Sequence, residues 1–134
     1  MRNGNEAEVG ERLHRRGWRK AFTVAEMVGK WDRLVGEVER GYDASIYEYT
    51  NDLYCRNWLH EAWLPLDDRT VLFWTPRIKG LDERFRAATV HDDGLALGRF
   101  HRVPHADLRW WRRCPRVLVG ELGEALRSAG AADA

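Results

Sequence analysis

Residues 42–63 read YDASIYEYTNDLYCRNWLHEAW and combine six aromatic side chains with a small group of polar ones. The apolar members that recur near helical spacing are Ile46, Tyr49, Leu53 and Trp58. This spacing predicts helix with one apolar face. The run Thr50–Asp52 consists of poor helix formers that cap well, so we expect two short helices broken at Asn51. The aromatic area indicates either a dense core or a recognition surface, with most of it assigned to the core.

A polar group within this segment is a candidate ligand pocket, formed by Tyr49, Asn51, Asp52 and Arg56. A carboxylate, a guanidinium and an amide can together orient a small ligand. Asp52 and Arg56 are one helical turn apart and can also pair with each other. We therefore favour a capping aspartate and a structural ion pair over a functional pocket.

The chain before this segment predicts a basic leader and one long helix. Residues 1–20 carry more basic than acidic side chains and offer little to bury, so we expect a flexible leader. Thr23 and Glu26 form a capping-box pattern, and apolar residues follow at helical spacing, which predicts a helix over 23–40 that ends at Gly41. We expect one globular domain over residues 21–128 and a disordered tail over 129–134.

The second half of the chain predicts a mixture of helix and strand. Residues 71–74 are apolar and fit a strand or a buried helical turn. Thr75 and Pro76 are typical of a helix start, which predicts a helix over 76–90. Residues 95–103 and 108–113 resemble the two strands of a hairpin, and a short terminal helix follows Pro115.

Together these elements predict a mainly helical α+β fold. Its N-terminal amphipathic helices would pack against a small C-terminal β-hairpin and a short terminal helix. Seven tryptophans supply much of the expected core.

The net charge of +1 hides an acidic stretch over residues 21–68 between two basic ones. Such segregation can steer a charged partner, or the two signs can pair internally when the parts pack. We favour internal pairing. The basic excess of the C-terminal part is concentrated in Arg109, Arg112, Arg113 and Arg116.

Composition and motifs exclude several classes of protein. No apolar run approaches the roughly 20 residues of a membrane span, and the N-terminus has no apolar signal region, so we expect a soluble cytoplasmic protein with no membrane partner. Phosphate-binding glycine loops and the common hydrolase motifs are absent, which argues against an enzyme. Cys55 and Cys114 lack metal spacing and are expected to be reduced, partly buried thiols; Cys55 and His60 do not share a helix face.

Histidines near turn aspartates are the only candidate metal ligands: His91, His101 and His105, with Asp92, Asp93 and Asp107. Their spacing matches no common ligand motif, so we expect no metal and no cofactor.

The strongest binding candidate is the segment 109–116, RWWRRCPR. Its candidate residues are Arg109, Trp110, Trp111, Arg112, Arg113 and Arg116. If 108–113 is a strand, the two tryptophans point to opposite faces and one needs a partner outside the core. Indole and guanidinium groups suit an acidic protein surface, and they also suit nucleic acid. Alternatively, a helix covers the second tryptophan and the arginines pair with the acidic stretch.

Three segments resemble a pattern found in a group of small uncharacterised bacterial proteins. They are GYDASIYEYTNDLYCRN (41–57), LDERFRAATV (81–90) and RWWRRCPR (109–116), the last followed by GELGEAL (120–126). The resemblance implies a bacterial, single-domain protein, and no activity is carried over from the group.

These observations predict a non-catalytic protein that binds another protein, of an accessory, regulatory or immunity type. Nucleic-acid binding through 109–116 is the first alternative. A ligand-binding or enzymatic pocket around Asp52 and Arg56 is the second.

Overall fold

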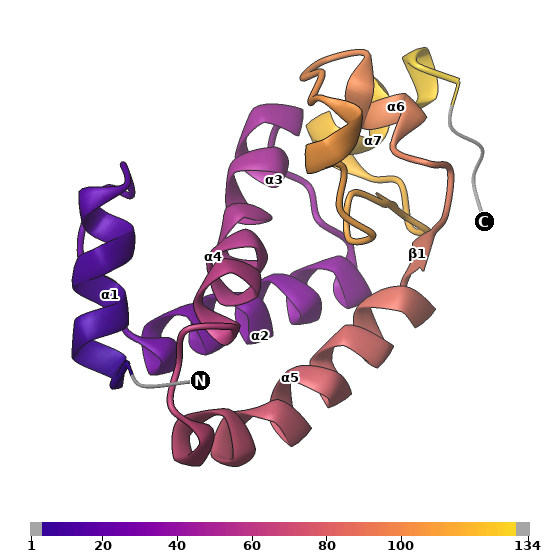
Figure 1. The fold of residues 1–134 in the computed structure, drawn as a ribbon. Helices are drawn as coiled ribbons and strands as arrows, with labels where there is room; N and C mark the ends of the chain where they lie inside the picture. Colours follow the sequence, from indigo (N-terminus) through magenta and orange to yellow (C-terminus); the bar gives the residue numbers. More distant parts are fainter. Residues whose placement is uncertain (1–3, 131–134) are drawn as a thin grey trace.

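A computed structural model describes residues 4–130 and shows a mainly helical chain with a small two-stranded antiparallel sheet (Figure 1). The helices are α1 (Glu6–Arg15), α2 (Val24–Arg40), α3 (Ile46–Asp52), α4 (Tyr54–Trp63), α5 (Asp68–Ala87), α6 (Leu95–Gly98) and α7 (Gly120–Ser128). The strands are β1 (Thr89–Val90) and β2 (Cys114–Pro115), and His105–Asp107 forms a 3-10 turn. The predicted α+β class is confirmed.

The predicted flexible leader is wrong for most of its length, because α1 packs into the core. Val9 and Leu13 on this helix are fully buried. Glu6 accepts a hydrogen bond from the backbone N–H of Val24, so α1 also caps α2. An isolated parallel bridge joins Gly4 to Leu66. Val9 and Leu13 are four residues apart, so they lie on one face of the helix and hold it against the core. The charged residues around them mask this helical pattern in the sequence.

Helix α2 follows the prediction closely. The Thr23 side chain accepts from the backbone N–H of Glu26, and Glu26 accepts from that of Thr23, which completes the capping box. Gly41 ends the helix with φ of 114°, a conformation that glycine adopts without steric cost. Helix α2 packs against both α4 and α5.

The aromatic segment forms two short helices, but the break lies at Leu53 and not at Asn51. Ser45 caps α3 by accepting from the backbone N–H of Glu48. The Thr50 hydroxyl bonds back to the carbonyl of Ile46, so it is satisfied inside the helix and does not interrupt it. The apolar Leu53 is buried at the junction between α3 and α4.

Helix α5 begins earlier than predicted and passes through the ambiguous apolar run 71–74 as helix. Asp67, not Thr75, is its N-cap and accepts from the backbone N–H of Thr70. Pro76 therefore lies inside the helix, where it cannot donate to the carbonyl four residues earlier. The Thr75 hydroxyl donates a hydrogen bond to the Val71 carbonyl in the same part of the helix.

The two strands predicted over 95–103 and 108–113 are wrong, although a small sheet exists elsewhere. Strands β1 and β2 pair antiparallel, with Thr89 opposite Pro115 and Val90 opposite Cys114. The Asp92 side chain accepts from the backbone N–H groups of Gly94 and Ala96, which starts helix α6 instead of a strand. The predicted terminal helix is confirmed as α7.

The core is rich in tryptophan, as expected, and within residues 4–130 it contains one buried carboxylate. Trp31, Trp58 and Trp111 are the largest fully buried side chains. Asp82 of α5 accepts from the Trp31 indole of α2 at 3.0 Å and forms an ion pair with Arg56 of α4. This carboxylate joins the three central helices.

Part of the predicted internal charge pairing is also present. Helices α2 and α5 are linked at the surface by Asp32–Arg77 and Glu39–Arg84 ion pairs. Exposed pairs of this kind contribute little to stability.

Residues 131–134 of the predicted tail, and residues 1–3 of the leader, lie outside the described residues. Ala129 packs partly against the core. Among residues 4–130 there is no helix with the length and apolar character that crossing a bilayer would require.

Candidate functional site: an arginine-lined cleft

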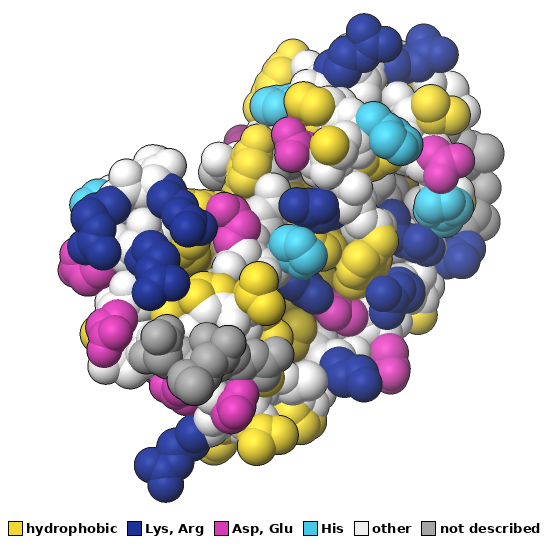
Figure 2. All heavy atoms as spheres, viewed as in Figure 1, with side chains coloured by type: hydrophobic (Ala, Val, Ile, Leu, Met, Phe, Trp, Pro, Cys, Tyr) yellow, Lys and Arg dark blue, Asp and Glu magenta, His cyan; other side chains and the backbone are white. Residues whose placement is uncertain are grey.

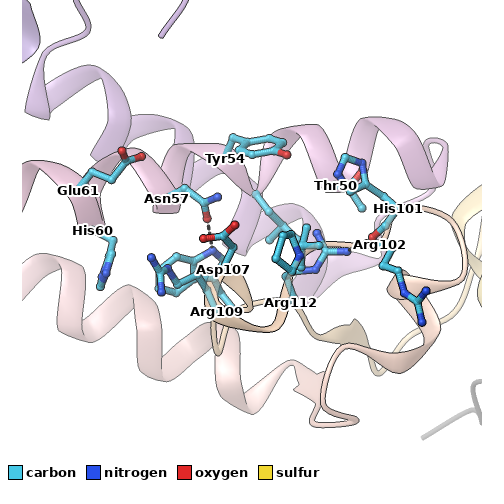
Figure 3. A pocket seen from close by; sticks show the side chains of 14 residues that line it. Thr50, Tyr54, Asn57, His60, Glu61, His101, Arg102, Asp107, Arg109 and Arg112 are labelled. Atoms are coloured by element: carbon cyan, nitrogen blue, oxygen red, sulfur yellow. Dashed lines mark hydrogen bonds between the residues drawn. The ribbon is translucent and has the colours of Figure 1, made fainter. Parts of the chain in front are cut away.

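A cleft of about 430 Å³ separates helices α3 and α4 from the segment 101–112 (Figure 3). The helical wall carries Thr50, Leu53, Tyr54, Asn57, His60 and Glu61. The charged residues of the opposite wall are Arg102, Asp107, Arg109 and Arg112. We call this feature the arginine cleft. It brings the second half of the aromatic segment against the arginine-rich segment, which are far apart in sequence.

Arg112 is a partly buried cation without a counter-ion. Its Nη2 donates to the His101 carbonyl oxygen at 2.8 Å, while its Nε–H is buried with no acceptor. None of the ion pairs found among residues 4–130 includes Arg112. Burial lowers the pKa of this guanidinium, which is the expected response of a cation removed from water. An anion in the cleft would supply the missing charge.

Two further arginines add to the positive charge of the cleft, and two histidines also line it. Arg109 lies at the end near His60, and Arg102 lies with His101 at the other end (Figure 3). Partial burial lowers the pKa of His60, and the charges of Arg109 and Arg56 lower it further. His60 is therefore mostly neutral in the empty cleft near pH 7.

The acidic groups of the cleft are Glu61 and Asp107. Neither takes part in an ion pair found within the described chain. The three arginines outnumber these two carboxylates, so the cleft keeps a positive balance. In Figure 2, Lys, Arg and His side chains lie over the half of the molecule that contains the C-terminal segments, with a few acidic ones between them.

Trp111 forms the rigid floor of the cleft. It is only 2% exposed, and its indole N–H donates to the Asn57 side-chain oxygen at 2.6 Å, the bond drawn in Figure 3. The Arg56 guanidinium lies 4.6 Å from the centre of the Trp111 ring. Because Arg56 is itself held by Asp82, the central ion pair supports the cleft from below.

The predicted binding segment 109–116 does not form one surface. Arg109, Trp111 and Arg112 line the cleft. Trp110 packs beside Phe85, and the Arg86 guanidinium lies 3.8 Å from the centre of its ring. The remaining arginines of the segment bind backbone and hydroxyl groups near β1: Arg113 donates to Thr89, and Arg116 to the Ala87 carbonyl. Residues 109–113 form turn and irregular structure before β2, so their side chains do not alternate as in a strand.

The predicted pocket residues Tyr49, Asn51, Asp52 and Arg56 do not line one pocket together: Asn51 and Asp52 line a second hollow, whereas Tyr49 and Arg56 do not. Tyr49 is buried and donates its hydroxyl hydrogen to the Arg113 carbonyl, so burial and this contact remove it from any pocket. Asp52 accepts from the Tyr42 hydroxyl at 2.7 Å instead of pairing with Arg56. Arg56 pairs with Asp82, a carboxylate 26 residues away, because the helix break turns the two side chains to different neighbours.

Other candidate chemistry does not assemble at the cleft. Burial raises the pKa of both the Cys55 and Cys114 thiols to about 12. Within residues 4–130, no group of three or more His, Cys, Asp or Glu side chains has metal-binding geometry. His91 contacts Asp93 at the surface.

Sequence reasoning gave no role to Asn57, Glu61 and Arg102, and it named Asp107 only as a possible metal ligand, yet all four line the cleft. No local pattern marks them, because their role depends on how the 101–112 turn folds against α4. The spacing of Arg102, Arg109 and Arg112 around a proline-containing loop is the one signal that the sequence contains.

Comparison of the chain with protein-family models, with curated proteins and with solved structures finds no significant match. The resemblance to small bacterial proteins therefore stays a prediction, and function has to be inferred from the cleft itself.

Proposed function

We propose that this chain is a non-catalytic binding protein that recognises an acidic segment of another protein in the arginine cleft. In this proposal it is a small bacterial cytoplasmic protein of an accessory, regulatory or immunity type. The partner would place carboxylate side chains between α4 and the 101–112 turn.

The observation that carries the proposal is the state of Arg112. A desolvated guanidinium without a carboxylate partner is costly, and such a group is usually paired in a folded protein. Its bond to the His101 carbonyl keeps it in the wall, so its orientation is fixed before a ligand arrives. Charge-assisted hydrogen bonds from arginine to carboxylate are among the stronger ones in proteins.

Nucleic-acid binding is the second candidate because phosphates would also satisfy these arginines. Sequence-tolerant binding of single strands usually uses exposed aromatic rings as stacking platforms. Of the two tryptophans in segment 109–116, Trp111 is buried, and Trp110 is partly buried with the Arg86 guanidinium over its ring. These two indoles offer little surface for base stacking, which favours a protein partner for this segment.

The proposal is tested by titrating the protein with a short oligoglutamate peptide, using calorimetry at low and at physiological salt. We expect saturable binding that the double variant Arg109→Ser, Arg112→Ser weakens at least about tenfold, since two cation–carboxylate contacts are removed. The matched control is Arg69→Ser, Lys79→Ser, two exposed cations on α5, which should bind like the wild type.

A matched-charge oligothymidylate distinguishes the two candidates. Tighter binding of the oligothymidylate than of the peptide, with a steep salt dependence, would favour nucleic acid. Equal binding by the cleft variant and the wild type would contradict the site. Circular dichroism checks that both variants fold.

A further inference from the structure

A second hollow of about 380 Å³ lies on the other side of the junction between α3 and α4. Tyr54 lines both this hollow and the arginine cleft. The side chain is 39% exposed, and Trp18 contacts its ring edge-on at 6.5 Å between ring centres. Tyr54 is therefore a supported ridge between two adjacent depressions.

The second hollow has the same sign of charge as the arginine cleft. Its cations are Arg19, Lys30 and Arg33. None of these three takes part in an ion pair found among residues 4–130. Its two carboxylates, Glu37 and Asp52, leave a positive balance, and Asp52 is already engaged by the Tyr42 hydroxyl.

An aromatic floor accompanies these cations. Phe22 lies in the hollow with the Lys30 ammonium 5.3 Å and the Arg19 guanidinium 5.3 Å from its ring centre. Trp18 packs edge-on against the same ring at 6.5 Å. Arg19 and Lys30 are thus held over an apolar base, an arrangement that receives both a carboxylate and the hydrocarbon part of an acidic side chain.

We propose that one extended acidic segment of the partner crosses Tyr54 and occupies both depressions at once. The two sites share a wall residue, carry unpaired cations and have similar volumes. A continuous peptide with two groups of acidic side chains, separated by a short spacer that passes over the Tyr54 ring, satisfies both. This inference rests on the proposed function and names the form of its ligand.

Linked occupation predicts a gain in affinity that separate sites cannot give. Once one acidic group is bound, the other is held near its site at high effective concentration. We expect a peptide with two glutamate clusters joined by a short Gly-Ser spacer to bind about 100-fold tighter than a peptide with one cluster. The stoichiometry should be one peptide per protein.

The experiment compares the two peptides on the wild type and three variants by calorimetry. The hollow variant is Lys30→Ser, Arg33→Ser, the cleft variant is Arg109→Ser, Arg112→Ser, and Arg69→Ser, Lys79→Ser is the control. Each of the first two should remove the advantage of the two-cluster peptide, while the control keeps it. Circular dichroism and the unfolding midpoint establish that each variant is folded.

The outcomes separate this inference from the proposed function. If the hollow variant binds the two-cluster peptide as tightly as the wild type, or if two peptides bind per protein, the linked site is overturned while the cleft remains supported. If neither peptide binds the wild type, both proposals fail.

Discussion

Arg56 on α4 and Asp82 on α5 form a two-point ion pair, with Nε–Oδ1 and Nη2–Oδ2 distances of 3.0 and 2.9 Å. Their side chains are only 13% and 10% exposed. The same carboxylate oxygen Oδ1 accepts the Trp31 indole N–H. The Arg56 guanidinium also lies 4.6 Å from the centre of the Trp111 ring, so this pair connects the helical core to the floor of the cleft.

Asp82→Asn should lower the free energy of unfolding by about 3 kcal/mol, because it leaves the Arg56 charge largely buried without a counter-ion. Asparagine still offers an oxygen to Trp31, so the loss reports the Arg56 contacts, both the charge pair and the hydrogen bond at Oδ2. Urea unfolding followed by tryptophan fluorescence measures it. Adding Arg56→Met should recover part of the loss, since the unpaired charge is then gone. No recovery would contradict this account.

His60 should titrate below its ordinary pKa, as burial, Arg109 and Arg56 all disfavour its charged form. NMR titration of the imidazole measures this, and Arg109→Ser should raise the value. In the wild type the His60 pKa is lower in the folded than in the unfolded state, so the unfolded state binds more protons. The free energy of unfolding is therefore highest above the unfolded pKa of about 6.5 and falls as the pH drops below it. A pKa above that value in the free protein would contradict the cleft electrostatics.

Gly10 and Gly29 should respond oppositely to alanine. A Cβ on Gly10 would lie 2.5 Å from the Phe22 carbonyl oxygen, so Gly10→Ala should destabilise by about 2 kcal/mol through displacement of α1. A Cβ on Gly29 meets nothing within 4 Å, and Gly29→Ala should stabilise α2 by about 0.5–1 kcal/mol. Thermal unfolding of both variants measures the difference. A neutral Gly10→Ala would show that α1 packs less tightly than described.

Phe73 and Phe85 provide a matched pair on one helix. Phe73 is 73% exposed and Phe85 is fully buried against Trp31. Phe73→Ala should change the free energy of unfolding by no more than about 0.5 kcal/mol, whereas Phe85→Ala should cost about 3–5 kcal/mol. Equal losses of unfolding free energy for the two variants in urea would contradict the assignment of the Phe85 face of α5 to the core.

Cys55 and Cys114 should resist thiol reagents in the folded protein. Burial, the largest cause in each case, and a nearby aspartate raise both pKa values to about 12, so the reactive thiolate is scarce at pH 8. A chromogenic disulfide reagent should react slowly with native protein and quickly with both thiols in urea. Cys55→Ser assigns the two signals. Rapid reaction without urea would indicate that one thiol is accessible.

Local signals predicted those elements whose boundaries depend on neighbouring residues. The capping box of Thr23 and Glu26 and the glycine at position 41 were sufficient to place α2. Pro76, by contrast, suggested a helix start because sequence cannot show that the preceding turn is already helical. Helix α5 starts instead after Asp67, whose side chain accepts a hydrogen bond from the backbone N–H of Thr70.

The site was less predictable because its contacts join distant segments. Arg109, Trp111 and Arg112 were expected to bind a partner, and they line the cleft. Their supporting residues were not foreseen, since Asn57 lies 54 residues from Trp111 in the chain. The expected pairing of Asp52 with Arg56 failed for the same reason: Asp82, the distant carboxylate, makes two hydrogen bonds to that guanidinium.

The position of Asp82 has a kinetic consequence. Its partners, Arg56 and Trp31, lie 26 and 51 residues earlier in the chain, so these bonds close only after α2, α4 and α5 have come together. We expect these long-range contacts to form after the rate-limiting barrier, where a contact slows unfolding and leaves the folding rate nearly unchanged. We therefore expect this carboxylate to set how long the folded chain persists rather than how quickly it forms.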